Sequence, residues 1–530
     1  MQTTVNQTRN FSWTGLRFFV LILLILGIVL RFGNIDNRAY SGDETSTSLQ
    51  IAGYTKTELR ELVFNGRVLS VEELLKYQDT NPNKSLLDTV TAMAAENPHH
   101  PPLYYVIARL WVQWLGPSPA VTRGVAAFIS LLIFPSIYWL CWELFESSLV
   151  GWIAIALVTV SPFHVWTAQT AREYSLWAVI ILVSGAVLLR TLRLNTKRSW
   201  LTYAGNLTVG VYSHLFFWLV AIGYGIYIFI LEGCKRTKTF NAYLRASLIG
   251  FLVFVPWIVL VNTDWTKVYT TTTWTKEKLP LVLGDDSLLK RWAGNLCSIF
   301  AFFDFDYQKP FLLWLTACLL AGMVGYAIYF LYRHTPQRVW VFIFTLMGVT
   351  ALTLVLPDLV LGGVRSASSR YLTPCYLGIQ LAVAYLLAMK MMPLSVKVWQ
   401  QKLWQLLFIV LISSGTLSCV ITPPHHRWNG TSVASEGVEV SQVSRIVNQA
   451  KSPLFILDIR PTEILPFSYQ LDPKVRLQLV ERPNVPNVAE GFSDIFLYSP
   501  SRELRKGLEQ EQNYKLKVVD ESLQVWQLEK

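Results

Sequence analysis

The chain has 530 residues, of which 52% are hydrophobic and only 15% are charged. Soluble globular proteins carry about 25% charged residues, so this composition excludes a disordered chain and an ordinary soluble enzyme. The net charge of +11 comes from short clusters of Lys and Arg between long apolar runs. That pattern is typical of cytoplasmic loops and does not indicate a nucleic-acid-binding surface. We therefore expect a membrane protein with no nucleic-acid partner.

The first apolar run, at residues 18–30, follows two arginines but precedes no small-residue cleavage site. We interpret it as an uncleaved first span. A spanning helix needs about 20 mostly apolar residues. Eleven such runs are predicted, at residues 15–32, 121–145, 149–166, 174–191, 199–214, 215–233, 244–262, 311–332, 338–361, 371–391 and 402–421. The predicted fold is an α-helical polytopic membrane protein with about 11 transmembrane helices.

The positions of the basic clusters predict the direction of these spans. Lysines and arginines concentrate in four segments between spans, at 190–198, 235–238, 333–338 and 390–402. The positive-inside rule places these segments in the cytoplasm. The segments that then lie outside are 33–120, 162–173, 263–310 and 362–370. The short apolar segment 101–116 carries Arg109 and Gln113, and we interpret it as an interfacial helix.

From about Thr422 the composition changes to that of a soluble domain. Short apolar runs at 454–457 and 495–498 have strand length, helical candidates lie at 436–450 and 501–512, and two late strands are expected. We predict a transmembrane domain at 1–421, with outer loops 33–120 and 263–310, and a small extracytoplasmic α/β domain at 422–530. None of the six cysteines lies in the second domain, so no disulfide framework is expected there.

Asp43 and Glu44 form an adjacent pair of carboxylates shortly after the first span. Such a pair near a membrane surface can deprotonate a hydroxyl group or hold a metal ion. The alternative is a helix N-cap, in which Ser41 or Asp43 caps a helix that runs through residue 54. One residue can serve both roles.

The other candidate residues also lie in segments predicted to be outside. His99 and His100 precede a double proline and an aromatic pair, where a helix start with surface histidines is the simpler explanation. Arg172 and Tyr174, in Ala-Arg-Glu-Tyr, suit either phosphate binding or membrane anchoring. The same choice arises at Arg365 and Arg370, two arginines on an outer loop. Weaker candidates are His164, His214 and the acidic run at 304–306.

The spans themselves carry few acidic residues, with Glu143 and Glu232 at inner ends and Asp358 near an outer end. A proton- or sodium-coupled transporter needs carboxylates inside the bilayer. Chemistry at the outer surface is therefore favoured over transport. No dense cluster of ligating residues predicts a metal site. No cofactor is expected from the sequence, and a divalent cation is kept as an alternative.

The order of these motifs resembles that of the GT-C glycosyltransferases. A first span is followed by Asp-Glu, then by His-Pro-Pro-Leu-Tyr-Tyr, then by Ala-Arg-Glu-Tyr and finally by Ser-Ser-Arg-Tyr before a late span. The resemblance is closest to the bacterial family related to protein O-mannosyltransferases and the lipid A aminoarabinose transferase. It covers residues 10–420, and the tail corresponds to the periplasmic domain that some members carry.

The resemblance implies roles for individual residues. Asp43 matches the catalytic acidic position, and Glu44 matches its partner. His100 stands where some members have a lysine that contacts the donor phosphate. Arg172 and Arg370 match the arginines of the Ala-Arg-x-Tyr and late-loop motifs. We also assign Tyr174 and Arg365 to donor-phosphate binding, and no residue to metal binding.

The function predicted from the residues and the resemblance is transfer of a hexosyl or pentosyl unit from a polyprenyl-phosphate donor. The reaction is expected to be inverting, with Asp43 as the general base. The expected partners are this donor, membrane lipids and an acceptor that is a glycan, lipid or protein. The expected location is the bacterial inner membrane, with the active site extracytoplasmic. Two alternatives stay open: a transporter or flippase of lipid-linked sugars, and a non-catalytic membrane assembly protein.

Overall fold

The computed structural model describes residues 13–36, 40–261, 273–282, 286–303, 310–392, 397–421, 432–510, 512 and 514–529. Contacts between residues divide the chain into two compact units. The membrane unit comprises residues 1–33 and 126–423, and the sheet unit comprises residues 34–125 and 424–530.

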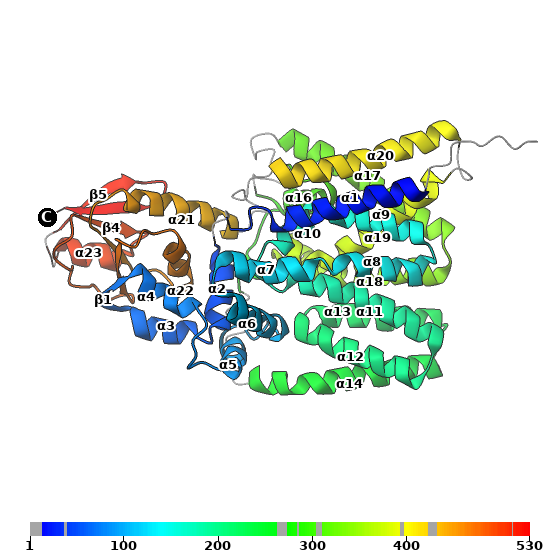
Figure 1. The fold of residues 1–530 in the computed structure, drawn as a ribbon, viewed down its shortest axis with the longest axis horizontal. Coiled ribbons are helices and arrows are strands. Elements are labelled where there is room, and N and C mark those ends of the chain that lie inside the picture. The colour runs from blue at the N-terminus through cyan, green and yellow to red at the C-terminus, as the bar shows by residue number, and fades with distance from the viewer. Residues whose placement is uncertain are drawn as a thin grey trace, which may run out of the picture. The chain divides into compact units, whose positions relative to one another are not determined.

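The membrane unit consists of long apolar helices (Figure 1). They are α1 (Trp13–Phe32), α8 (Ile133–Phe145), α9 (Ser148–Thr159), α10 (Pro162–Ala168), α11 (Tyr174–Leu194), α12 (Lys197–Ser213), α13 (Phe217–Leu231), α14 (Lys238–Val261), α16 (Leu288–Phe300), α17 (Pro310–His334), α18 (Gln337–Leu361), α19 (Thr373–Met391) and α20 (Val398–Ile421). Helix α7 (Pro119–Ser130) contains the boundary between the units at residue 125.

The eleven segments predicted to span the membrane are all helical. Among the described residues, eight helices are long and apolar enough to cross a bilayer, and the bent pair α9–α10 would make a ninth. Helix α13 is apolar but shorter. The chain is thus a multi-pass membrane protein. The predicted interfacial segment forms α6 (Leu103–Leu115), which is too short to span.

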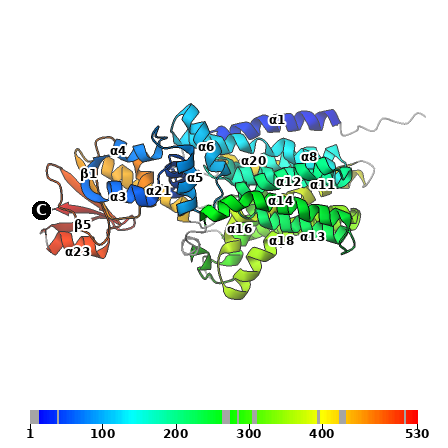
Figure 2. The same cartoon turned by 90° about the horizontal axis from the view of Figure 1, so that it is seen from below.

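Helices of the membrane unit pack side by side: α8 contacts α9 and α11, α11 contacts α12, and α12 contacts α14. Figure 2 shows α11, α12 and α14 in the same parallel arrangement from a second direction. Helix α19 is the most enclosed candidate span, with 83% of its apolar window buried, whereas α14 and α17 are only 22% buried. The exposed leucines of such helices suit lipid.

A break separates α9 from α10, which meet at an angle of 64°. The carbonyl groups at the end of α9 lose their helical partners there. Arg31 of α1 replaces those partners, because its guanidinium donates to the carbonyl oxygens of Val158 and Thr159 at 3.2 and 3.0 Å. The bend is therefore held by a buried cation from the first helix.

The sheet unit contains six strands in the order β1-β3-β2-β4-β6-β5. Strands β2, β3 and β4 are parallel, and the others pair antiparallel. The strands are β1 (Asn65–Ser70), β2 (Pro453–Leu457), β3 (Arg476–Val480), β4 (Asp494–Tyr498), β5 (Lys515–Asp520) and β6 (Val525–Glu529). The helices of this unit are α2 (Gly42–Ile51), α3 (Lys56–Val63), α4 (Val71–Leu75), α5 (Leu86–Glu96), α6, α21 (Ser432–Asn448), α22 (Pro461–Ile464) and α23 (Arg502–Gln510).

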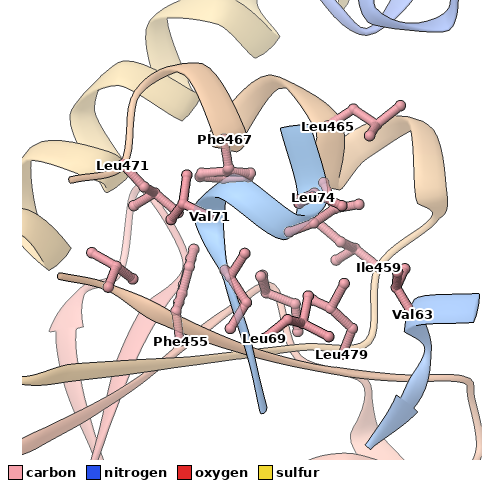
Figure 3. Close-up of a cluster of buried hydrophobic side chains, with 14 of the residues drawn as sticks. Val63, Leu69, Val71, Leu74, Phe455, Ile459, Leu465, Phe467, Leu471 and Leu479 are labelled. Atoms are coloured by element: carbon pink, nitrogen blue, oxygen red, sulfur yellow. The ribbon is translucent and has the colours of Figure 1, made fainter. Parts of the chain in front are cut away.

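Alternate residues of β2 supply two hydrophobic cores on opposite faces of the sheet. Phe455 belongs to the larger core, which also contains Leu69 and Leu74 from the N-terminal part of the chain (Figure 3). Leu454 belongs to the smaller core, which Leu504 of α23 helps to close. Helices thus cover both faces, as in an α/β domain.

The structure divides the chain differently from the predicted domains. The predicted boundary at residue 421 lies within two residues of the crossing at residue 423. The segment 33–120, predicted as an outer loop, packs with the C-terminal residues, because β1 pairs with β3 along Leu69–Leu477 and Ser70–Arg476. The physical reason is that β3 would otherwise be a sheet edge with unpaired main-chain groups.

Candidate functional site

The carboxylate pair lies at the start of α2 in the sheet unit. Ser41 is the N-cap residue, and its side chain and that of Glu44 form a reciprocal capping box. The N-cap predicted at Ser41 or Asp43 is thus present at Ser41, with Glu44 as its partner. Asp43, in the first turn, is half-buried, and the positive end of the helix dipole favours its ionised form.

Glu44 is 3% exposed and forms a two-pronged ion pair with Arg123 of α7. The Nε and Nη2 atoms of Arg123 donate to the two carboxylate oxygens, both at 2.8 Å. The Arg123 guanidinium also lies over the Tyr40 ring at 5.1 Å. Burial, aided by the Glu44 charge, raises the pKa of the Tyr40 hydroxyl. Glu44 is therefore held rigidly, which orients the adjacent Asp43.

His99 and His100 lie in the turn before α6, with ring centroids 4.2 Å apart. His100 is buried and its ring centroid is 6.4 Å from that of Tyr105. Its backbone N–H donates to the carbonyl of Asn97 at 2.9 Å. The double proline thus ends a tight turn that brings the two imidazoles together at an interplanar angle of 47°, and α6 packs against α2 in the same unit.

The membrane unit gathers a second set of predicted residues where α11 begins. Arg172 and Tyr174 are 5% and 2% exposed. His214, between α12 and α13, stacks on Trp177 of α11 with ring centroids 3.9 Å apart. Its Nδ1 accepts the backbone N–H of Phe216 at 3.1 Å, so the proton of the neutral ring lies on Nε2.

Arg370 joins this set from the short helical turn Ser369–Leu372. Its guanidinium carbon lies 5.8 Å from the ring centroid of Tyr174, 5.7 Å from that of Trp274 and 5.4 Å from that of Tyr371. We call Arg172, Tyr174, His214, Trp274 and Arg370 the arginine–aromatic cluster. Aromatic rings attract a guanidinium group through their π-electrons, so these rings help to hold Arg370 in place.

Arg365 has a different environment in the same loop. Its Nη1 donates to Asp358 Oδ1 at 2.9 Å, and the other oxygen of Asp358 accepts from the N–H and Oγ of Ser366 at 2.6 and 2.7 Å. A Cβ atom at Gly363 would lie 2.2 Å from the Arg365 guanidinium. This packing makes Arg365 a part of the loop's framework.

Sequence reasoning predicted Arg172, Tyr174 and Arg370, named His214 as a weaker candidate, and missed Trp274 and Arg123. Trp274 follows a Thr-rich stretch that gave no signal of contact with a loop a hundred residues away. Arg123 lies inside a predicted span. The acidic run at 304–306 lies outside the described residues. Within the described ranges, no three His, Cys, Asp or Glu side chains form a group that could hold a metal ion.

A scan against models of protein families found no match to this chain, and a search of curated proteins also found none. Solved structures are similar. ArnT from Cupriavidus metallidurans bound to undecaprenyl phosphate is 12% identical, with a TM-score of 0.53 over 98% of each chain. The apo state of that protein is 11% identical, with a TM-score of 0.54 over 97% of this chain and 98% of the other. The chain has the GT-C fold.

The Archaeoglobus fulgidus oligosaccharyltransferase tethered with an acceptor peptide shares the GT-C fold at 11% identity and a TM-score of 0.50. The match covers 89% of this chain and 64% of that protein. These likenesses confirm the predicted GT-C fold, an α-helical membrane part with a small α/β part. At such low identity they bear on the fold alone, so the chemistry has to be argued from the residues.

Proposed function

We propose that the protein is a glycosyltransferase that transfers a monosaccharide from a polyprenyl-phosphate donor to an acceptor hydroxyl. The arginine–aromatic cluster of the membrane unit carries this proposal. It combines two arginines, a histidine and two aromatic rings, and that chemistry suits a phosphate attached to a lipid. ArnT bound to undecaprenyl phosphate supports this class of donor.

Arg172 and Arg370 are the proposed ligands of the donor phosphate. A guanidinium binds phosphate oxygens through two parallel N–H groups, and such charge-assisted bonds are about twice as strong as neutral ones. Tyr174 contributes its hydroxyl and orients Arg370 with its ring. His100 is proposed as a further phosphate contact, because it matches the family position that is lysine in other members.

Asp43 is the proposed general base. The acceptor hydroxyl oxygen attacks the anomeric carbon while its proton moves to the Asp43 carboxylate, and the bond between that carbon and the phosphate oxygen breaks. Polyprenyl phosphate leaves as an anion, which the arginines stabilise. One displacement inverts the anomeric configuration. Glu44 acts through Asp43, because its ion pair with Arg123 fixes the first turn of α2.

Arg365 receives a structural role in place of the phosphate-binding role expected from the sequence. Its pairing with buried Asp358 supports the loop that presents Arg370. Asp358 and Glu143, which pairs with Arg193, thus serve as partners of loop and helix-end cations. This use of the acidic groups favours an enzyme over a cation-coupled transporter. We place the active site and the C-terminal domain on the extracytoplasmic side of a bacterial inner membrane.

The test is turnover of radiolabelled polyprenyl-phosphate sugars by the purified protein with a membrane extract. We expect the wild type to consume one donor of a panel and Asp43→Asn to lose about 10²- to 10⁴-fold in rate. Ser48→Ala is the matched control, because Ser48 lies on the same helix as Asp43 and its loss removes a hydrogen bond to Tyr40. Normal turnover by a folded Asp43→Asn protein would refute the base. Consumption of no donor by the wild type would refute the transferase.

A further inference from the structure

A pocket lies on the sheet unit, and none of the residues assigned to the reaction line it. It has a volume of about 490 Å³, within the range of about 300–1,000 Å³ that is usual for small-molecule sites. Its walls come from the residues that follow β2, β3 and β4 and from α3. The pocket therefore lies at the carboxyl edge of the three parallel strands.

The topology explains why a pocket forms there. Strand β2 has β3 on one side and β4 on the other, although β3 follows β2 and precedes β4 in the chain. The connections from the carboxyl ends of β2 and β4 consequently diverge. Crevices at such points are where open parallel sheets bind ligands.

The charges in the pocket balance. Three arginines and three carboxylates line it, and each arginine has a carboxylate partner: Arg60–Glu481 at 3.5 Å, Arg482–Asp458 at 3.3 Å, and Arg460–Glu463 with Nε to Oε1 at 2.7 Å. The Arg60, Arg460 and Arg482 side chains are 45–78% exposed. The wall thus alternates donors and acceptors, with no net charge to favour an anion.

The place that a phosphate takes in other doubly wound sheets is already filled. There, the anion binds at the N-terminus of the helix that follows a strand. Here, the buried Asp458 carboxylate accepts the N–H of Ser501, the residue that precedes α23, at 3.2 Å. The Ser501 hydroxyl in turn accepts from Leu504 N. A second anion would meet the Asp458 charge.

We propose that this pocket binds a neutral saccharide. Neighbouring sugar hydroxyls present a donor and an acceptor side by side, and paired arginine and carboxylate groups match both. Phe64 and Ile459, which are 7% and 6% exposed, also line the wall and offer small apolar contacts to the C–H face of a sugar ring. The proposal does not rest on the transferase assignment, since the residues involved are separate from Asp43 and from the arginine–aromatic cluster.

The test uses the full-length protein in lipid nanodiscs and an array of oligosaccharides of hexose and N-acetylhexosamine, each also present in a phosphorylated form. We expect binding to neutral members. The double variant Arg60→Gln/Glu481→Gln should weaken it about tenfold or more, since it removes charge-assisted hydrogen bonds. Arg67→Gln/Glu73→Gln, an exposed pair elsewhere in the same unit, is the matched control and should bind normally.

Three results would overturn the proposal: no neutral member bound by the wild type, stronger binding of phosphorylated members, or equal binding by both double variants. Amide hydrogen exchange of the unaltered protein gives a second measurement that needs no variant. The bound glycan should slow exchange at 459–463 and 481–482, and unchanged exchange there would place the glycan elsewhere. Asp43→Asn should retain binding while losing turnover, which separates this proposal from the proposed function.

Discussion

Two buried arginines, Arg123 of the sheet unit and Arg31 of the membrane unit, have different kinds of partner. In the sheet unit, Arg123 is neutralised by the carboxylate of Glu44 through two short hydrogen bonds. In the membrane unit, Arg31 is held by carbonyl oxygens and the Phe134 ring, and Arg370 lies against three aromatic rings. A carboxylate cancels the charge of an arginine, whereas carbonyls and rings only offset its burial. The first arrangement pairs two opposite charges, whereas the second surrounds a charge with dipoles and rings.

We expect the largest effect from Arg123→Met, which removes the cation that pairs with buried Glu44. Glu44 would stay buried without its cation, which typically costs about 3–5 kcal/mol. The opening free energy of α2, measured by amide hydrogen exchange, should fall by that amount. Arg67→Met, in an exposed pair with Glu73, should cost less than about 1 kcal/mol. Equal losses in the two variants would mean that burial does not set the strength of the Arg123 pair.

Arg370→Lys tests the corresponding arginine of the membrane unit. Lysine keeps the charge but loses the planar fork that binds two phosphate oxygens and stacks on rings. We expect kcat/KM for the donor to fall about ten- to hundredfold, the equivalent of one charge-assisted hydrogen bond. Arg338→Lys, at an exposed pair with Glu146, is the control. If both lysine variants turn over the donor normally, Arg370 does not bind phosphate.

Ser366→Ala tests a loop of the membrane unit in which a carboxylate is the partner of an arginine. The Ser366 hydroxyl donates to Asp358 and accepts from the Trp292 indole N–H at 3.0 Å. Its loss should lower the opening free energy of the loop by about 1 kcal/mol, measured by amide exchange at 364–367. Ser368→Ala is the control, because the Ser368 hydroxyl makes no hydrogen bond among the described residues. A larger loss in the control would reject the framework role of Asp358.

We expect the smallest effect at the exposed N-cap of α5 in the sheet unit. Hydrogen bonds from the side chain and then the backbone of Ser85 lower the pKa of Asp88. Because the folded pKa lies below the unfolded one, ionised Asp88 stabilises α5 at neutral pH, and this contribution is lost as the pH falls through the folded pKa. The Asp88→Asn variant should lack this acid sensitivity, with a difference below about 1 kcal/mol. An identical acid profile of α5 exchange in both proteins would contradict the role of the carboxylate.

Much of the membrane unit could be predicted from the sequence, because a spanning helix is encoded locally. The predicted spanning segments coincide with helices, but a break separates α9 from α10, and α12 and α13 lack the length or apolarity of a span. The bend depends on Arg31, which is more than a hundred residues away from the carbonyls that it binds. No local pattern reports such a partner.

The sheet unit was harder to predict from the sequence, because some of its strands pair with segments that are distant in the chain. Strands β2, β4, β5 and β6 were predicted from short apolar runs, and an N-cap was predicted at Ser41 or Asp43. Strand β1 and its partner β3 were missed, because each is a short run whose pairing is fixed by a segment about 400 residues distant. For the same reason the sequence suggested Asp43 and Glu44 as a pair but gave no sign of Arg123.

The pairing of β1 with β3 has a consequence for biosynthesis. A ribosome that adds about 5–20 residues per second needs roughly 20–80 seconds to proceed from β1 to β3. During that time Leu69, Val71 and Leu74 have no sheet to pack against, since their core partners Phe455 and Leu479 do not yet exist. The nascent chain must therefore keep this apolar segment from aggregating while most of its helices are synthesised. Its final hundred residues complete a domain that was begun before the second helix of the membrane unit was synthesised.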